Sequence, residues 1–403
     1  MQYTLTSAHV QHLTASLLRS YLKLKDFGRS CPAATLLAVL FSAAARLCSL
    51  FAAARRLLRA PSHETVRNAV AAQLSGIRHL QRRLNKALTA LLPAGLRRRR
   101  HRLAIDLTLI PYHGRPDDND NELLRGQAKS GTTHFHGYAT AYLIRHGCRF
   151  TLALRYVERG EKMEAIVKDL LRRCAQVGVR PELLLLDRGF WGVGVIRYLQ
   201  AARCPFLMPV IARGKKARTP GGPSGTRVFW GWRRGGFGTY TLQETGKGRK
   251  AKVSICVHRR PRRGRRGKRG MEHLVYAWWG FEPSSPYAVS QLYRQRFGIE
   301  TSYRQMNQGR IPTCSRDPAV RLLLVGVALL LRNVWVYLHE EVLSEPRRGR
   351  RRYHLERLPL LDLLLWLLHE AERLLGVVDE TSTQRPIPEE FMTADRQHLF
   401  CNY

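Results

Sequence analysis

A single carboxylate interrupts an apolar run at residues 103–112, which reads Leu-Ala-Ile-Asp-Leu-Thr-Leu-Ile-Pro-Tyr. The run follows a helical region and has the length and composition of a buried strand. Burial of the Asp106 carboxylate in such a strand costs several kcal/mol unless a cation or a metal ion compensates the charge. The run therefore predicts a compensating group beside Asp106. The alternative is a strand-end aspartate that accepts backbone N–H bonds.

A second acidic residue, Asp187, follows four leucines at residues 183–186 and precedes Arg-Gly-Phe-Trp-Gly. Folds of the α/β class place site residues at the carboxyl ends of buried strands, just before a turn. The sequence patterns predict elements in the order strand, strand, strand, helix, strand, helix, strand. The two acids lie on the first and fourth of these strands. This order predicts an α/β fold with an RNase H-like mixed sheet. In the loop between the first two strands, Asp117, Asp118 and Asp120 are interpreted as solvated, with capture of a metal ion as the alternative.

Residues 287–310 contain the third acidic position and are expected to form a helix. Tyr293 lies three residues before Arg296 and seven before Glu300, so one stripe of the helix carries all three side chains. The carboxylate then lies between a guanidinium and a phenol. The simpler interpretation is an amphipathic helix whose Glu300 pairs with Arg296 and Arg304.

The chain is strongly basic, with 68 Lys and Arg against 30 Asp and Glu and a net charge of +38. A compact body with this charge repels itself unless a polyanion screens it, so DNA or RNA is the expected partner. The hydrophobic content of 44% excludes a disordered polymer and favours an enzyme-sized fold over a histone-like protein. The scattered cysteines show no zinc spacing, and we expect no membrane span or signal peptide. We therefore expect a cytoplasmic, nucleoid-associated protein.

The remaining periodicity predicts an all-helical N-terminal domain, a catalytic core in two parts, a β-rich basic insertion between them, and a C-terminal helix with a tail. The N-terminal helices either form a DNA-binding module of the helix-turn-helix kind or serve only in packing. In the insertion, residues 227–232 have a strand-like pattern and residues 259–269 form a basic arm. Its Trp230 and Trp232 either stack on DNA bases or pack against the insertion itself. The expected boundaries are residues 1–96, 97–212 with 273–345 for the core, 213–272 for the insertion, and 346–403.

Three carboxylates on separate elements suit hard cations such as Mg²⁺, and two such ions can assist phosphodiester cleavage. The sequence resembles the DDE transposases of bacterial insertion sequences, in particular the IS4-like superfamily. The resemblance extends over roughly residues 100–340. It rests on Ile105-Asp106-Leu-Thr, on Leu186-Asp187-Arg-Gly-Phe and on Tyr293-x-x-Arg296-x-x-x-Glu300.

The resemblance implies cleavage of transposon ends and strand transfer into target DNA, with Asp106, Asp187 and Glu300 as the catalytic and metal-binding triad. It implies two Mg²⁺ ions, for which Mn²⁺ would substitute. The implied partner is double-stranded DNA, at the inverted repeats and at the target, bound by a homodimer, and no membrane partner is expected. The expected DNA contacts are Tyr293, Arg296, Arg304, Arg310, Arg188, Trp230 and Trp232.

One position departs from the family pattern. In that family a lysine follows the glutamate by seven residues, whereas this chain has Asn307. Arg304 or Arg310 could supply the missing charge. Two alternatives therefore stay open: a catalytically inactive DNA-binding protein derived from a transposase, and an RNase H-like structure-selective nuclease.

Overall fold

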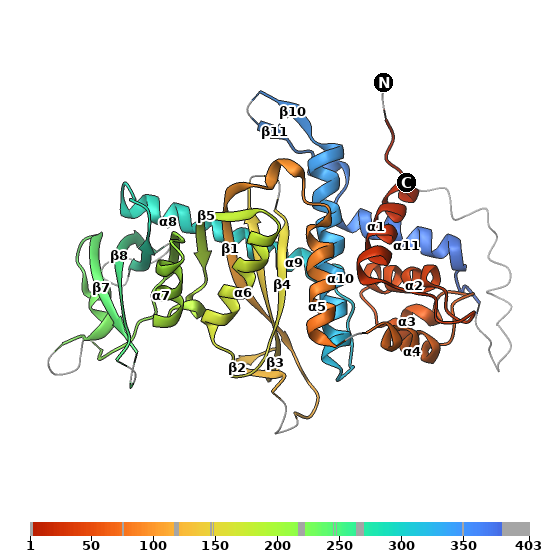
Figure 1. The fold of residues 1–403 in the computed structure, drawn as a ribbon, viewed down its shortest axis with the longest axis horizontal. Coiled ribbons are helices and arrows are strands. Elements are labelled where there is room, and N and C mark those ends of the chain that lie inside the picture. The colour runs from red at the N-terminus through yellow and green to blue at the C-terminus, as the bar shows by residue number, and fades with distance from the viewer. Residues whose placement is uncertain are drawn as a thin grey trace, which may run out of the picture.

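A mixed sheet forms the centre of the computed structural model, which is drawn in Figure 1. The structure describes residues 3–380 apart from 75, 117–120, 146, 148, 217–221, 245, 247, 263–269 and 349. Some predictions fall outside these residues. They are the acidic loop with Asp117, Asp118 and Asp120, the larger part of the basic arm, and the tail from residue 381.

Nine strands of the described chain build this sheet in the order β2-β3-β1-β5-β6-β9-β8-β7, and β4 also pairs with β3. β1, β5 and β6 run parallel to one another, whereas the other pairs are antiparallel. The expected mixed sheet is therefore confirmed. The strands are β1 (Arg99–Pro111), β2 (Leu123–Lys129), β3 (Thr132–Ile144), β4 (Thr151–Val157), β5 (Val179–Leu186), β6 (Phe206–Pro209), β7 (Gly236–Gln243), β8 (Lys250–Pro261) and β9 (Met271–Trp279).

The segment expected to be an insertion extends the central sheet. Its strands β7 and β8 join the sheet through β9, which pairs with β6. The strand-like pattern at residues 227–232 was a wrong prediction, because residues 227–231 belong to the 3₁₀ helix η3 (Gly225–Gly231) and Trp232 caps it. Gly225 has a φ of +61°, and the Thr226 hydroxyl donates to the Ile211 carbonyl at 2.6 Å. These local constraints turn the chain where periodicity alone indicated extension.

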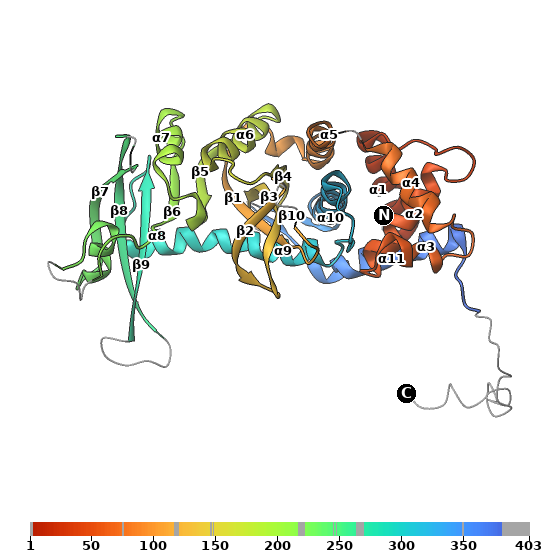
Figure 2. The same ribbon diagram turned by 90° about the horizontal axis from the view of Figure 1, so that it is seen from below.

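Helices cover the two faces of the sheet, as Figure 2 shows. α6 (Met163–Gln176) and α7 (Val193–Ala201) lie on one face, and α8 (Pro286–Arg294) and α9 (Gly298–Asn307) lie on the other. Successive side chains of β1 alternate between these faces. Leu103 and Ile105 belong to the core cluster that contains the α6 residues, whereas Ala104 clusters with residues of α8 and α9. Asp106 follows in phase with Ala104 and therefore lies under α8 and α9.

The helix expected at residues 287–310 is two helices joined by one 3₁₀ turn, Gln295–Phe297. The first helix begins with an N-cap, since the Ser285 hydroxyl accepts the Ala288 N–H at 3.1 Å. The second begins at Gly298. A Cβ at that residue would lie 2.7 Å from the Arg149 guanidinium, so the glycine permits this close approach. The tighter turn changes the phase of the helix between Tyr293 and Glu300.

Helices from both ends of the chain pack together beside the sheet (Figure 1). α11 (Leu360–Leu375) contacts α1 (Ser7–Leu22) and α2 (Ala33–Ala45), and α3 (Leu50–Arg55) and α4 (His63–Gln73) complete this group. α5 (Ile77–Ala90) and α10 (Pro318–Tyr337) lie between the group and the sheet. α10 with its extension is long and apolar enough to cross a membrane, but 94% of its apolar window is buried inside the protein, as in a core helix.

Two buried asparagines attach β4 to these helices. Asn85 of α5 accepts the Leu154 N–H at 2.7 Å and donates to the Leu154 carbonyl at 2.8 Å. Asn333 of α10 does the same for Thr151, at 3.0 and 2.8 Å. The two side-chain amides thus bind backbone groups of β4 that a neighbouring strand would otherwise bind. At these positions β4 needs no further pairing strand.

His136 of β3 is a buried titratable group that lowers the stability of the folded protein at low pH. It is 2% exposed, and within the described residues neither ring nitrogen has a hydrogen-bond partner. Burial, with a smaller contribution from Arg321, lowers the pKa of His136 to about 4. The unfolded chain therefore binds a proton between pH 4 and 6.5 that the folded chain excludes.

We predict that His136 makes the free energy of unfolding fall as the pH is lowered from about 6.5 to about 4, by about 3 kcal/mol in total. His136→Leu should remove this part of the slope, measured by urea unfolding at a series of pH values. The difference between the two profiles isolates His136, since the other titrating groups are common to both proteins. Parallel profiles would show that the buried ring keeps its ordinary pKa.

Candidate active site

Three acidic side chains from separate elements converge on one guanidinium. Asp106 comes from the middle of β1, Asp187 directly follows β5, and Glu300 lies in the first turn of α9. Arg296 Nη1 lies 2.9 Å from Asp106 Oδ2, and its Nη2 lies 3.3 Å from Asp187 Oδ1 and 3.2 Å from Glu300 Oε1. The compensating cation expected beside Asp106 is therefore an arginine in this structure. Of the two arginines that the simpler interpretation paired with Glu300, Arg296 forms the ion pair, and among the described contacts Arg304 forms none with Glu300. The same Arg296 also binds both aspartates.

Burial differs sharply within this group. The side chains of Asp106 and Arg296 are only 11% and 7% exposed, whereas those of Asp187 and Glu300 are 42% and 50% exposed. Burial raises the pKa of Asp106 to about 6 although the Arg296 charge opposes the shift, and Asp187 adds to it. The site is thus a fixed, buried pair with two carboxylates that face solvent. A substrate would meet Asp187 and Glu300 first.

Aromatic rings hold the guanidinium in place. Arg296 Cζ lies 5.6 Å from the ring centroid of Tyr293 and 5.9 Å from that of Phe297. The Tyr293 hydroxyl donates to the Leu186 carbonyl at 3.3 Å and so ties α8 to the end of β5, next to Asp187. Burial alone would lower the pKa of Arg296, but Tyr293 and the carboxylates together raise it. Arg296 therefore stays a cation.

A second set of residues, which the sequence did not single out, positions α9 on the sheet. The Tyr303 hydroxyl donates to the Asp106 carbonyl at 3.2 Å and lies 2.7 Å from the Thr140 hydroxyl. Tyr142 of β3 hydrogen bonds to Ser302 and accepts from Arg332 Nη2 at 2.6 Å. The available signal was Tyr303 itself, which lies three residues after Glu300 and therefore on the same helix face.

The donor set suits a hard divalent cation, since carboxylate oxygens are the ligands such ions prefer. Arg296 already serves as a cation bound by all three carboxylates. Within the described residues, no group of three or more acidic, histidine or cysteine side chains is arranged to share one metal ion. The Arg296 guanidinium lies within ion-pair distance of all three carboxylates, in the place that a shared cation would take.

A cleft of about 640 Å³ adjoins Asp187, and four of the expected DNA contacts line it: Arg188, Trp230, Tyr293 and Arg296. Trp232 lies outside this lining, because its ring packs against Phe229 at 5.4 Å and closely over Gly238. Trp232 therefore packs against the insertion itself. Trp230 is half-buried and packs against the core as well as lining the cleft, and its stacking on DNA bases stays a prediction. Other residues that line the cleft were not predicted from the sequence, because they are far apart in the chain and meet only in the folded protein. They include Arg262, His273 and Phe297.

The position of the missing lysine lies farther along α9. Arg304 is exposed to solvent. Arg310 Nε donates to the Asn307 side-chain oxygen at 3.0 Å, so a guanidinium lies directly beside the asparagine. Of the two residues expected to replace the lysine charge, Arg310 is the one that contacts Asn307.

A family model described as Transposase DDE domain matches residues 97–334, which include all three acids. The chain belongs to the DDE transposase family. The predicted family is thereby confirmed, and the narrower IS4-like grouping stays a prediction. The comparison with curated proteins found no match.

This transposase is also similar to a solved piggyBac transposase, determined by cryo-electron microscopy as a synaptic complex with hairpin DNA. The TM-score is 0.50 at 11% identity, and the alignment covers 97% of this chain and 77% of the other. At this identity the likeness concerns the fold, and it agrees with the RNase H-like class expected from the order of strands and helices.

We predict different consequences for the two tryptophans of this transposase. Trp230→Ala should weaken binding of a fluorescent DNA duplex with a short single-stranded end by about tenfold, because an aromatic platform in the cleft is lost. Both tryptophans are half-buried against the core, so each change should lower the free energy of unfolding by about 2 kcal/mol. The matched variant Trp232→Ala should leave the DNA affinity close to that of the parent, because Trp232 does not line the cleft. Equal loss of DNA affinity in both variants, measured by anisotropy on folded protein, would refute this division.

Proposed function

We propose that this DNA transposase cuts transposon ends and joins them to target DNA through the carboxylate triad Asp106, Asp187 and Glu300, as a homodimer on paired ends. The observation that supports the proposal is the convergence of these three carboxylates on a single cation, Arg296. Three neighbouring carboxylates repel one another, so a cluster of this kind is expected to bind positive charge.

The residues of the triad have different parts in this scheme. When bound, two Mg²⁺ ions would activate the attacking oxygen and stabilise the leaving oxygen of a phosphodiester. Asp106 is buried and fixed, because its Oδ1 accepts the Leu107 N–H at 2.8 Å. Asp187 and Glu300 are half-exposed and would face the incoming DNA strand. All three would hold the ions.

The tyrosines nearest the triad are poor candidates for a covalent nucleophile. The hydroxyls of Tyr293 and Tyr303 donate to main-chain carbonyls, and burial raises the pKa of both. A phenol held in this way does not supply the reactive phenolate. The reaction would instead depend on positioning and on charge neutralisation, with water or a DNA 3′ hydroxyl as the nucleophile.

Arg296 has two roles in this proposal. Without ions and DNA it neutralises the carboxylates. When DNA enters, its guanidinium turns from the carboxylates toward a phosphate and vacates the space between them. The 3₁₀ turn that carries Arg296 suits such a change, since a short 3₁₀ stretch within a helix often marks a functional hinge. Exposed Arg188 and Arg304, with Arg310 beside Asn307, would hold the flanking phosphates.

We predict that Asp187→Asn and Glu300→Gln each lower the rate of strand cleavage by about a thousandfold, because both carboxylates act on the reacting phosphate. DNA binding should change little. Cleavage and gel-shift assays on the element's terminal repeats measure both effects. Glu182→Gln is the matched control, since Glu182 is an exposed carboxylate of the same strand, β5.

The same assays separate the alternatives. Binding without cleavage by the parent protein would favour a catalytically inactive DNA-binding protein. Nicking without any joined product would favour a structure-selective nuclease. Undiminished cleavage by both triad variants would remove the triad from the mechanism.

We further predict that Arg296→Gln raises the affinity of the DNA-free protein for Mn²⁺ by about tenfold, because the ion no longer competes with a guanidinium for the carboxylates. Calorimetric titration with Mn²⁺ measures this without any cleavage assay. Arg304→Gln removes the same charge from an exposed position of α9 and should leave the affinity close to that of the parent. Unchanged affinity in Arg296→Gln would show that the arginine and the ion do not share the site.

A further inference from the structure

A small basic hairpin projects from the molecule where the chain passes from the end of α10 to α11 (Figure 1). It consists of β10 (Glu345–Arg347) and β11 (Arg350–Arg352), which are paired antiparallel. Arg347, Arg348 and Arg352 are exposed. An isolated pair of strands is marginally stable in water, so the way in which this hairpin is held decides whether it is a defined surface.

Glu340 anchors the hairpin. It lies in η6 (Leu338–Leu343), a π-helical turn that follows α10, and is only 3% exposed. Its carboxylate accepts a hydrogen bond from the Tyr353 hydroxyl and lies 3.4 Å from Arg145 Nη1 of the segment that ends β3. Its carbonyl accepts from Arg351 Nη1 at 2.7 Å. One buried acid thus joins the hairpin to the sheet.

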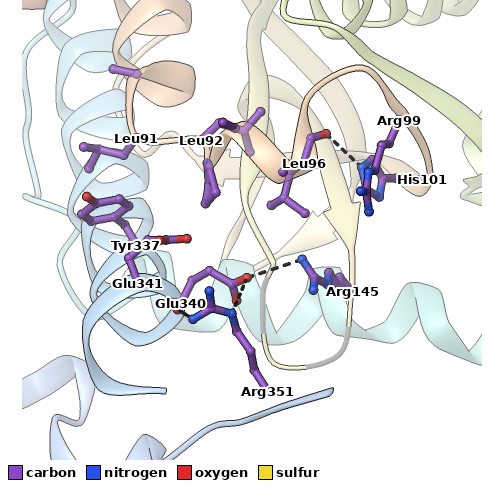
Figure 3. Close-up of a pocket in the computed structure, with 14 residues that line it drawn as sticks. Leu91, Leu92, Leu96, Arg99, His101, Arg145, Tyr337, Glu340, Glu341 and Arg351 are labelled. Carbon is purple, nitrogen blue, oxygen red and sulfur yellow. Dashed lines mark hydrogen bonds and ion pairs between the residues drawn. The ribbon is translucent and has the colours of Figure 1, made fainter. Parts of the chain in front are cut away.

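A cavity of about 860 Å³ lies at the base of the hairpin (Figure 3). Arg351 and Glu340 line one side, and Arg99 and His101, from the start of β1, line the other. His101 is held in place, since its Nε2 lies 2.9 Å from the Leu96 carbonyl. The surface around this cavity thus includes part of the hairpin and the exposed start of β1, where Arg98, Arg99 and Arg100 follow in sequence.

This surface is well separated from the triad. Arg99 and Asp106 lie on the same strand seven residues apart, which is about 23 Å at about 3.3 Å per residue. Within the described chain, Arg99, Arg347 and Arg348 form no ion pair. Their charges are thus available to a partner, whereas Arg145 and Arg351 are bound to Glu340.

We propose that the hairpin and the start of β1 form a second DNA-binding surface that grips the phosphate backbone of a duplex. Duplex DNA presents about one negative charge per 1.7 Å along its axis, which suits a group of exposed, unpaired arginines. The duplex is either a more distant part of the transposon end or the target DNA. The inference rests on DNA as the substrate and does not depend on the assignment of the triad.

The test compares two double variants with the same change in charge. Arg347→Glu with Arg348→Glu alters the hairpin. Lys168→Glu with Arg197→Glu alters exposed positions of α6 and α7. We expect the hairpin variant to bind duplex DNA at least tenfold more weakly, and the slope of log K against log salt to decrease by about two. The control should show a much smaller change in both quantities. Equal changes in the two variants would overturn the proposal, because net charge alone would then account for them.

Two activity assays on the hairpin variant identify the duplex. If the hairpin holds the target, end cleavage stays near the parent rate while joining to a target plasmid falls. If it holds the transposon end, cleavage and joining fall together. Unchanged cleavage and joining would again overturn the proposal. Thermal unfolding of each variant checks that folding is intact, and failure of the triad variants to abolish cleavage would leave this binding result unaffected.

Discussion

The balance of one buried guanidinium against three carboxylates is the interaction on which the centre of this transposase depends. Asp106, Asp187 and Glu300 come from two strands and a helix, and nothing in their local sequence brings them together. In a partly buried site, three like charges a few ångströms apart repel one another by several kcal/mol. Arg296 removes that repulsion and couples the position of β1 and β5 to that of α9. Loss of this cation without a replacement would therefore loosen the site as a whole.

The sequence predicted the charges of this site better than its geometry. The apolar run around Asp106 required a cation, and the motif around Glu300 contained it. The 3₁₀ turn at Arg296 could not be predicted, because the residues around it have the pattern of one continuous helix. Periodicity reports which face of a helix is apolar, but it does not report where one turn is tighter.

The same distinction applies to the sheet. Alternating residues indicated strands, and the order of strands and helices indicated a mixed sheet. Pairing partners, however, depend on edges that the sequence does not mark, so the segment expected to be an insertion proved to continue the sheet through β9. The sequence around Trp230 and Trp232 did not distinguish the roles of these two residues. Only the 3₁₀ helix between Gly225 and Gly231 places one beside the cleft and the other against Phe229.

Acidic residues are scarce in this chain, with 30 against 68 basic ones, and two of the buried ones organise arginines. Asp106 fixes Arg296 within the triad, and Glu340 fixes Arg351 at the base of the hairpin. In both places a buried acid holds one arginine in position while neighbouring arginines stay exposed. A polyanion that binds such a surface meets exposed arginines on a segment whose backbone is already held, so less backbone entropy is lost on binding. The buried acids therefore place part of the positive charge on segments of defined backbone structure.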